Sequence, residues 1–227
     1  MKLAKINNKW EIWLPDFRAD RPEWGWWERE RLQSMNETVK KGNVVYYVGA
    51  ESGDMAGLLA IWGAKMVLFE PNKRAWPQIK AVWDANNLEH PVCIPEFASD
   101  RTTDIDILTQ TWPDSVELPI ISNHGFAELK DPDDIPELRI DDLEGKLPPP
   151  DMISIDVEGA EGRVLRGAEQ TLREHHPRIY LSLHHEFMHD SYGEMWFDLC
   201  DWIKSLGYKE TVLGNQPHEG HIMYSVD

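Results

Sequence analysis

Cysteine and long apolar runs are scarce in this sequence, and each shortage excludes a class of protein. Cys93 and Cys200 are the only cysteines in 227 residues, too few for a disulfide framework or a zinc signature. No stretch approaches the ~20 apolar residues of a membrane helix. The first residues lack the apolar core of a signal peptide. We therefore expect a cytoplasmic protein in a reducing compartment, with no membrane partner.

Positive charge is also scarce. Lys and Arg number 23 against 40 Asp and Glu, which gives a formal net charge of −17. A surface of this sign repels phosphate backbones, so duplex nucleic acid is not an expected partner. The charge does not choose between a cationic and a neutral substrate, and the oligomeric state is not indicated. The length suffices for one sizeable core, with or without a small cap.

Apolar runs alternate with helix-like segments along most of the chain. The expected strands are Val44–Val48, Met66–Phe69, Val92–Pro95, Met152–Asp156 and Ile179–His184. The expected helices are Met55–Trp62, Ala75–Asn86, Arg163–His175 and Tyr192–Leu206. This alternation predicts an α/β fold with a mostly parallel sheet and helices on both faces. Tyr208–Leu213 and His221–Val226 are expected to close the sheet as an antiparallel C-terminal strand pair.

The N-terminal residues 1–43 are rich in tryptophan and are interpreted as an extension or cap on the main domain, residues 44–227. Alternating apolar residues predict a hairpin or edge strand over Ile6–Leu14. Apolar residues at helical spacing predict a helix over Trp24–Lys40. The tryptophans of this extension are expected to pack over the sheet edge or to line the site.

Residues 100–150 interrupt the alternation. This segment is acidic and rich in proline, and it contains no recognisable motif. A loop of this length in a compact domain is usually functional or disordered. We interpret it as an insertion that covers the site, with a short strand or hairpin around Pro119–Asn123. A solvated insertion is the alternative.

The segment Val44–Pro71 combines a strand, a glycine turn, a helix, a second strand and an acid. Gly49 and Gly53 lie in the turn, and Glu70 ends the second strand. Glycines let a ligand approach the backbone, and an acid at the next strand tip can accept hydrogen bonds from ribose hydroxyls. The pattern predicts a nucleoside-binding crevice. A tight turn followed by an ordinary exposed glutamate is the alternative.

The glycine turn lacks the Gly-x-Gly-x-x-Gly pattern of dinucleotide enzymes. Glu51 and Asp54 stand at the helix entrance, where a pyrophosphate would bind, and they oppose its charge. These acids tolerate a ligand with a positive centre and no phosphate, such as S-adenosylmethionine. A nicotinamide-dependent oxidoreductase or epimerase is therefore less favoured, and the sequence has no Tyr-x-x-x-Lys pair.

Two further acidic and histidine-containing segments follow later strands. Asp156, Glu158 and Glu161 follow the fourth expected strand, and His184 ends the fifth. Because ligands bind beyond the carboxyl ends of strands in open α/β sheets, Asp156 and His184 are expected to flank one cavity. Such a pair can act as a general base for a hydroxyl, or it can bind a divalent metal. We favour the base; strand and helix capping are the structural alternatives.

With these motifs, the chain resembles the FkbM-type methyltransferases, a branch of the Rossmann-like S-adenosylmethionine-dependent enzymes. The resemblance covers about Val44 to Leu183 and is carried by Val48–Asp54, Phe69–Pro71, Ile140–Leu143, Ile153–Glu161 and Val164–Ala168. It implies a class I methyltransferase sheet, S-adenosylmethionine as methyl donor, and O-methylation of a hydroxyl on a sugar, another small molecule or a glycan. A non-catalytic binding protein of the same fold is the alternative.

The motifs and the resemblance together give expected roles to individual residues. The expected donor-binding residues are Gly49, Ala50, Glu51, Gly53, Glu70, Ser99, Asp100 and Asp156. The expected catalytic residues are His184 and Asp156, and the expected acceptor-binding residues are Glu158, His185, Asn123 and His124. No metal is expected, and a cation at Asp156 and His184 is the less favoured alternative. Tyr47 stands where the family usually carries an acid that holds the donor, and Glu51 or Asp54 could replace that acid.

Overall fold

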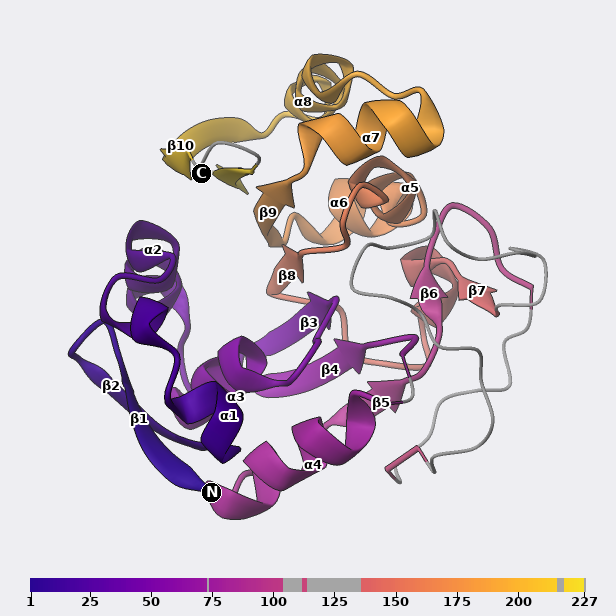
Figure 1. The fold of residues 1–227 in the computed structure, drawn as a ribbon. Coiled ribbons are helices and arrows are strands. Elements are labelled where there is room, and N and C mark those ends of the chain that lie inside the picture. The colour runs from indigo at the N-terminus through magenta and orange to yellow at the C-terminus, as the bar shows by residue number, and fades with distance from the viewer. Residues whose placement is uncertain (73, 104–111, 114–135, 216–218, 227) are drawn as a thin grey trace.

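A seven-stranded sheet organises the chain, in the strand order β10-β11-β9-β8-β3-β4-β5 (Figure 1). The computed structural model describes residues 1–72, 74–103, 112–113, 136–215 and 219–226. The sheet strands are β3 Val44–Val48, β4 Lys65–Phe69, β5 Val92–Ile94, β8 Met152–Ile155, β9 Arg178–Leu183, β10 Lys209–Asn215 and β11 Gly220–Ser225. Only β11 runs against its neighbours, pairing antiparallel with β9 and β10. The predicted mostly parallel sheet with an antiparallel C-terminal pair is confirmed.

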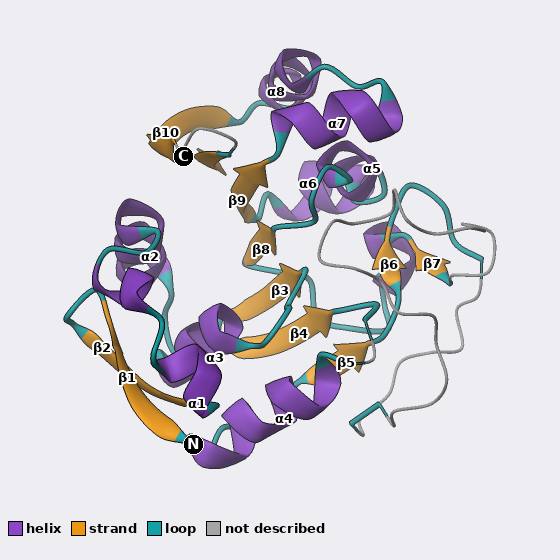
Figure 2. Ribbon diagram, in the orientation of Figure 1, coloured by secondary structure: helices purple, strands orange, loops and turns teal. Residues whose placement is uncertain are grey.

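Helices cover both faces of the sheet (Figure 2). The helices are α1 Asp16–Ala19, α2 Arg29–Thr38, α3 Asp54–Ile61, α4 Trp76–Ala85, α5 Glu161–Arg166, α6 Glu169–His175, α7 His185–Tyr192 and α8 Trp196–Ser205. Val45 and Tyr47 of β3 pack with α2, α3 and α4, while Tyr46 and Val48 pack with α5, α6 and α8. Because β3 is buried on both faces, its sequence is continuously apolar rather than alternating.

The N-terminal residues pack on the face covered by α2, α3 and α4. Strands β1 (Lys2–Ile6) and β2 (Trp10–Leu14) form a hairpin, which was one of the two predicted possibilities and begins before the predicted Ile6. Its turn has Asn7 and Asn8 at φ values of 51° and 57°, a left-handed conformation that asparagine tolerates. Buried side chains of the hairpin and of α2 belong to the same apolar cluster as those of β3, α3 and α4. This segment therefore contributes to the core beneath the sheet.

The predicted helix over Trp24–Lys40 is shorter in the structure. A 3-10 helix spans Pro22–Gly25, and α2 begins only at Arg29. Between them Glu28 adopts a left-handed φ of 38°, which no α-helix continues through. The indole of Trp24 donates to the carbonyl of Arg18 and packs edge-on against Trp27, so tertiary contacts determine the break.

Glycines determine where the helices end in the two C-terminal segments that the sequence predicts to be helical. Arg163–His175 becomes α5 and α6, separated at Gly167, where a Cβ would lie 1.7 Å from the carbonyl oxygen of Ser99. Helix α7 ends at Tyr192 and is capped by Gly193, which has a φ of 64°. Helix α8 begins at Trp196. The single helix predicted over Tyr192–Leu206 is therefore wrong at its start, because α7 occupies the residues before the glycine.

The segment predicted to cover the site is described in part. Strands β6 (Phe97–Ala98) and β7 (Glu137–Leu138) form a small parallel pair, and a 3-10 helix spans Ile140–Leu143. The strand predicted around Pro119–Asn123 lies outside the described residues. Within the described part of the chain, no helix has the length and apolar character needed to cross a bilayer.

Candidate active site

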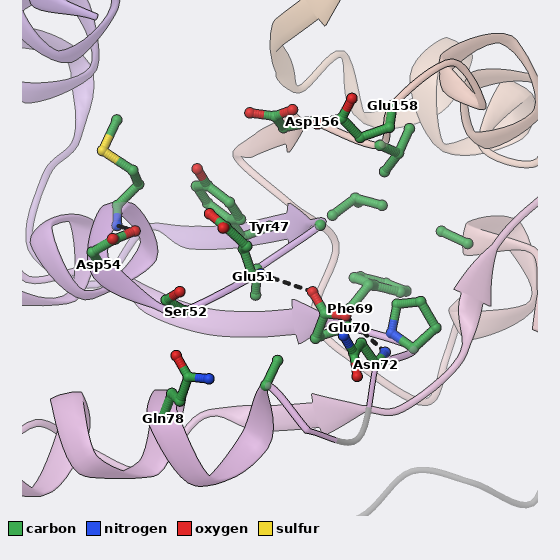
Figure 3. A pocket seen from close by; sticks show the side chains of 18 of the residues that line it. Tyr47, Glu51, Ser52, Asp54, Phe69, Glu70, Asn72, Gln78, Asp156 and Glu158 are labelled. Atoms are coloured by element: carbon green, nitrogen blue, oxygen red, sulfur yellow. Dashed lines mark hydrogen bonds between the residues drawn. The ribbon is translucent and has the colours of Figure 1, made fainter. Parts of the chain in front are cut away.

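A cavity of about 520 Å³ lies beyond the carboxyl ends of the parallel strands (Figure 3). Its walls come from the β3–α3 loop, the residues after β4 and β5, the end of β8, and N-terminal residues between β2 and α2. This is the position at which open α/β sheets bind ligands, because the loops separate there and leave a crevice. The predicted crevice is therefore present as a cavity.

Gly49 lets the β3–α3 loop lie directly against the end of β8. Its φ is 86°, and a Cβ on it would lie 1.9 Å from the carbonyl oxygen of Asp156. Gly53, with a φ of 80°, is the N-cap of α3 and packs against Ile79. Gly49 and Ala50 line the cavity, whereas Gly53 shapes the loop from behind it.

Glu70 is buried at the end of β4 and faces the cavity (Figure 3). Its Oε2 accepts a hydrogen bond from the backbone N–H of Glu51, and its Oε1 accepts one from Asn72, both at 2.7 Å. Burial raises the pKa of Glu70 to about 7, although these two hydrogen bonds oppose the shift. Each carboxylate oxygen has a second lone pair, so Glu70 can accept further hydrogen bonds from a ligand.

Arg18 neutralises part of the acidic β3–α3 loop. From α1, its guanidinium donates to the carboxylate of Asp54, with Nε at 2.8 Å, and it lies 3.4 Å from Glu51. Burial raises the pKa of Glu51, although the charge of Arg18 opposes this. Burial likewise raises the pKa of Tyr47, so its phenol stays protonated. Asp54 is thus engaged by Arg18. That Asp54 replaces the acid which the family usually carries at the position of Tyr47 stays a prediction.

Asp156 lies above a buried arginine that the sequence did not single out. Arg31 of α2 pairs with Glu28 at 2.6 Å and donates to the hydroxyls of Ser154 and Ser182 at 3.0 and 2.6 Å. Its Nη1 lies 3.6 Å from Oδ2 of Asp156, whose side chain is 28% exposed. Arg31 therefore joins α2 to the ends of β8 and β9. The only signal was its place within the helix expected over Trp24–Lys40.

His184 lies at the end of β9, surrounded by carboxylates. Its Nδ1 bonds to Glu161 Oε1 at 2.7 Å. Its Nε2 lies 3.7 Å from Asp156 Oδ1, 3.7 Å from Glu158 Oε2 and 3.9 Å from Glu219 Oε1. Burial alone would lower the pKa of His184, but the hydrogen bond to Glu161 and the nearby negative charges outweigh it and raise the pKa to about 9. The imidazole is therefore mostly protonated at neutral pH in this arrangement.

The structure brings most of the predicted residues together. Those that line the cavity are Gly49, Ala50, Glu51, Glu70, Asp156, Glu158 and His184. His185 is not among the lining residues and begins α7. Asn123 and His124 lie outside the described residues. Glu219, which sequence reasoning missed, completes the wall beside His184, and only its charge could have suggested it.

Ser99 and Asp100 are placed away from the cavity. Ser99 donates to Glu137, and Arg163 donates to Asp100 Oδ1 at 2.8 Å. Burial by itself would raise the pKa of Asp100, but the hydrogen bond and charge of Arg163 lower it. The residues just before them, Glu96–Ala98, line the cavity at this end instead. The lining residues therefore lie one to three positions before Ser99.

The fold is that of Rossmann-like class I methyltransferases. A precorrin-6y C5,15-methyltransferase from Geobacter metallireducens matches with a TM-score of 0.54 and 10% identity, over 94% of this chain and 92% of that one. A Streptococcus mutans protein solved in complex with SAH, S-adenosylhomocysteine, matches with a TM-score of 0.52 and 8% identity, over 86% and 94%.

The family is more specific than the fold. A model of the FkbM methyltransferase domain matches residues 47–210, and the chain belongs to this family. An FkbM methyltransferase from Methylobacillus flagellatus is similar in structure, with a TM-score of 0.57 and 19% identity over 81% of this chain. The matched part spans 43% of that protein. No curated protein sequence matches significantly.

Proposed function

We propose that this chain is an S-adenosylmethionine-dependent methyltransferase that methylates a hydroxyl oxygen on a sugar, another small molecule or a glycan. The observation that carries the proposal is the buried carboxylate of Glu70, which keeps lone pairs directed at a cavity of about 520 Å³. Membership of the FkbM family supports the methyl-transfer chemistry. The choice of an oxygen acceptor rests on the resemblance and on the acids at the far wall.

The lining residues fit such a donor. Glu70 would accept hydrogen bonds from the ribose hydroxyls, because it lies at the tip of the strand after the glycine loop. Arg21 lines the cavity and would face the carboxylate of the methionine portion. The other acids of the cavity wall suit the positive sulfonium and ammonium groups. No patch of cations offers a cradle for a pyrophosphate among the described lining residues, since Arg18 already pairs with Asp54.

The far wall would hold the acceptor. When bound, the donor supplies a methyl group on a sulfonium sulfur: a carbon–oxygen bond forms, the carbon–sulfur bond breaks, and the hydroxyl proton must leave. Asp156, a partly exposed acid at this wall, would accept a hydrogen bond from that hydroxyl. His184, mostly protonated at neutral pH, would orient Asp156 and the acceptor, and could take a proton only after losing its own. Glu158 offers a second oxygen for acceptor contact.

Calorimetry with three ligands tests the donor assignment. S-adenosylmethionine and S-adenosylhomocysteine should bind with a stoichiometry near one, and NAD should not. Binding of NAD alone would favour an oxidoreductase, and binding of none of the three would favour a non-catalytic binding protein.

Transfer of a radiolabelled methyl group tests the acceptor class. A panel of sugars and hydroxyl-bearing small molecules should give a labelled methyl ether, which resists hydroxide, whereas a labelled ester would release methanol. With an acceptor identified, His184→Ala should lower turnover far more than donor affinity. Unchanged turnover would remove His184 from the mechanism.

A further inference from the structure

We propose that Asp156, His184 and Glu219 bind one divalent cation at the far wall of the cavity. These residues come from the end of β8, the end of β9 and the position before β11. One ligand atom from each lies within 4.8 Å of the others. Carboxylate and imidazole together form a ligand set that suits Mn²⁺, Fe²⁺ and Zn²⁺.

His184 is held as a metal-ligating histidine is held. Its Nδ1 bonds to Glu161, a fully buried carboxylate whose Oε1 also accepts the backbone N–H of Gly159 at 3.1 Å. Because Glu161 accepts a hydrogen bond from the Nδ1–H group, the ring is fixed with Nε2 toward the cavity wall. The other ring N–H of a ligating histidine usually donates a hydrogen bond to a carboxylate in this way. This bond sets the tautomer and raises the basicity of the ligating nitrogen.

The space in front of Nε2 has the dimensions of a cation site. The His184 side chain is only 8% exposed, and among the described residues Nε2 has no hydrogen-bond partner. Oxygens of Asp156, Glu158 and Glu219 stand 3.7–3.9 Å from Nε2, beyond hydrogen-bond distance. A cation about 2 Å from each atom would fill this gap with a modest contraction.

Both acidic ligands have contacts that orient them. The Nε2 of His221 lies 2.8 Å from Oε1 of Glu219, and Arg31 lies beside Oδ2 of Asp156. This leaves Oδ1 of Asp156 toward His184. Partners of this kind hold metal-ligating side chains in place, and their removal commonly weakens metal affinity 10–100-fold. Glu158 would supply a fourth oxygen or leave its position to a ligand.

The consequence for catalysis rests on the proposed function. A cation here would lie where the acceptor hydroxyl is placed, and bound cations lower the pKa of an oxygen ligand. Binding of the cation itself requires neither donor nor acceptor.

The test is a Mn²⁺ titration of the full chain after removal of metals by chelation, with free Mn²⁺ followed by electron paramagnetic resonance. One saturable site is expected. Glu219→Gln should weaken it by at least about tenfold. Glu51→Gln, which removes a carboxylate elsewhere on the wall of the same cavity, should change it less than about twofold, since only the general field is altered. Spin-echo modulation of the bound Mn²⁺ should show a ¹⁴N coupling from one imidazole.

Several results would overturn the cation site. They are no saturable binding, equal weakening by both variants, or bound Mn²⁺ without a nitrogen coupling. Each would leave His184 bonded to Glu161 with no cation at its Nε2. Circular dichroism checks that Glu219→Gln folds, and Asp156→Asn repeats the test from the second acidic ligand. Calorimetry with S-adenosylhomocysteine on the metal-free chain separates the two proposals, because loss of one binding event does not imply loss of the other.

Discussion

Glu70 should make the binding of S-adenosylhomocysteine depend on pH. Burial raises the pKa of this carboxyl to about 7 in the free protein. The ionised form accepts hydrogen bonds from ribose hydroxyls more strongly than the neutral form does. Binding should therefore favour the ionised carboxylate, lower its pKa and release a proton when the experiment begins below pH 7.

The size of the effect follows from that pKa. At pH 6 roughly one chain in ten would carry an ionised Glu70, and at pH 8 roughly nine in ten. Affinity should therefore rise roughly tenfold between these pH values and then level off. Calorimetry at pH 6, 7 and 8, in two buffers of different ionisation enthalpy, measures both the affinity and the number of protons released.

Glu70→Gln is the control, because an amide does not titrate. The variant should lose the pH slope, and its affinity at pH 8 should fall roughly 10–100-fold, since hydrogen bonds to a charged group contribute roughly 1.5–3 kcal/mol each. The same raised pKa predicts that this group's contribution to stability is present below its unfolded value near 4.5 and is lost as the pH rises through about 7. A flat affinity profile in the unaltered protein, or an equal slope in the variant, would refute this assignment of Glu70.

Three substitutions test other parts of the site, each by urea unfolding. Gly49→Ala should destabilise the fold more than Gly42→Ala by roughly 1–3 kcal/mol, because both have a φ near 90° but only the former collides with the end of β8; equal losses would contradict this. Arg31→Met should cost roughly 3–5 kcal/mol, and adding Glu28→Gln should restore part of it by removing the unpaired buried charge; no restoration would argue against the pair. Glu51→Asn should keep or raise stability by up to about 1 kcal/mol, because asparagine tolerates the left-handed φ of 48°; a clear loss would show that the Glu51 side chain matters more than its backbone.

The bounds of the parallel strands were predicted to within one residue, because strands buried on both faces have continuously apolar sequences. Strands β3, β4 and β9 illustrate this, since both of their faces contact helices. Helix ends were predicted less well, because they depend on contacts between distant residues. At Gly167 the helix is interrupted where the backbone of Ser99 packs against it. The residues around Gly167 contain no pattern that predicts this contact.

The candidate site was predictable to a similar degree. Glu70, Asp156 and His184 follow strands, and the rule that parallel strands share one edge brings them to one cavity. Arg18 and Arg31 were missed, because their partners lie far along the chain and charged residues in a short helical segment usually face solvent. Glu219 was missed because it precedes β11 outside any motif.

The ion pair network of Arg31 has a consequence for how this family member can be shortened. A fragment that begins at residue 44 would retain every strand of the seven-stranded sheet, yet it would lack the guanidinium that links the serines of β8 and β9 to Asp156. It would also uncover Tyr180, whose hydroxyl bonds to Ser34 and Thr38 of α2. Expression of residues 44–227 alone should thus give a chain in which Ser154, Ser182 and Tyr180 have lost these hydrogen-bond partners and are exposed to water.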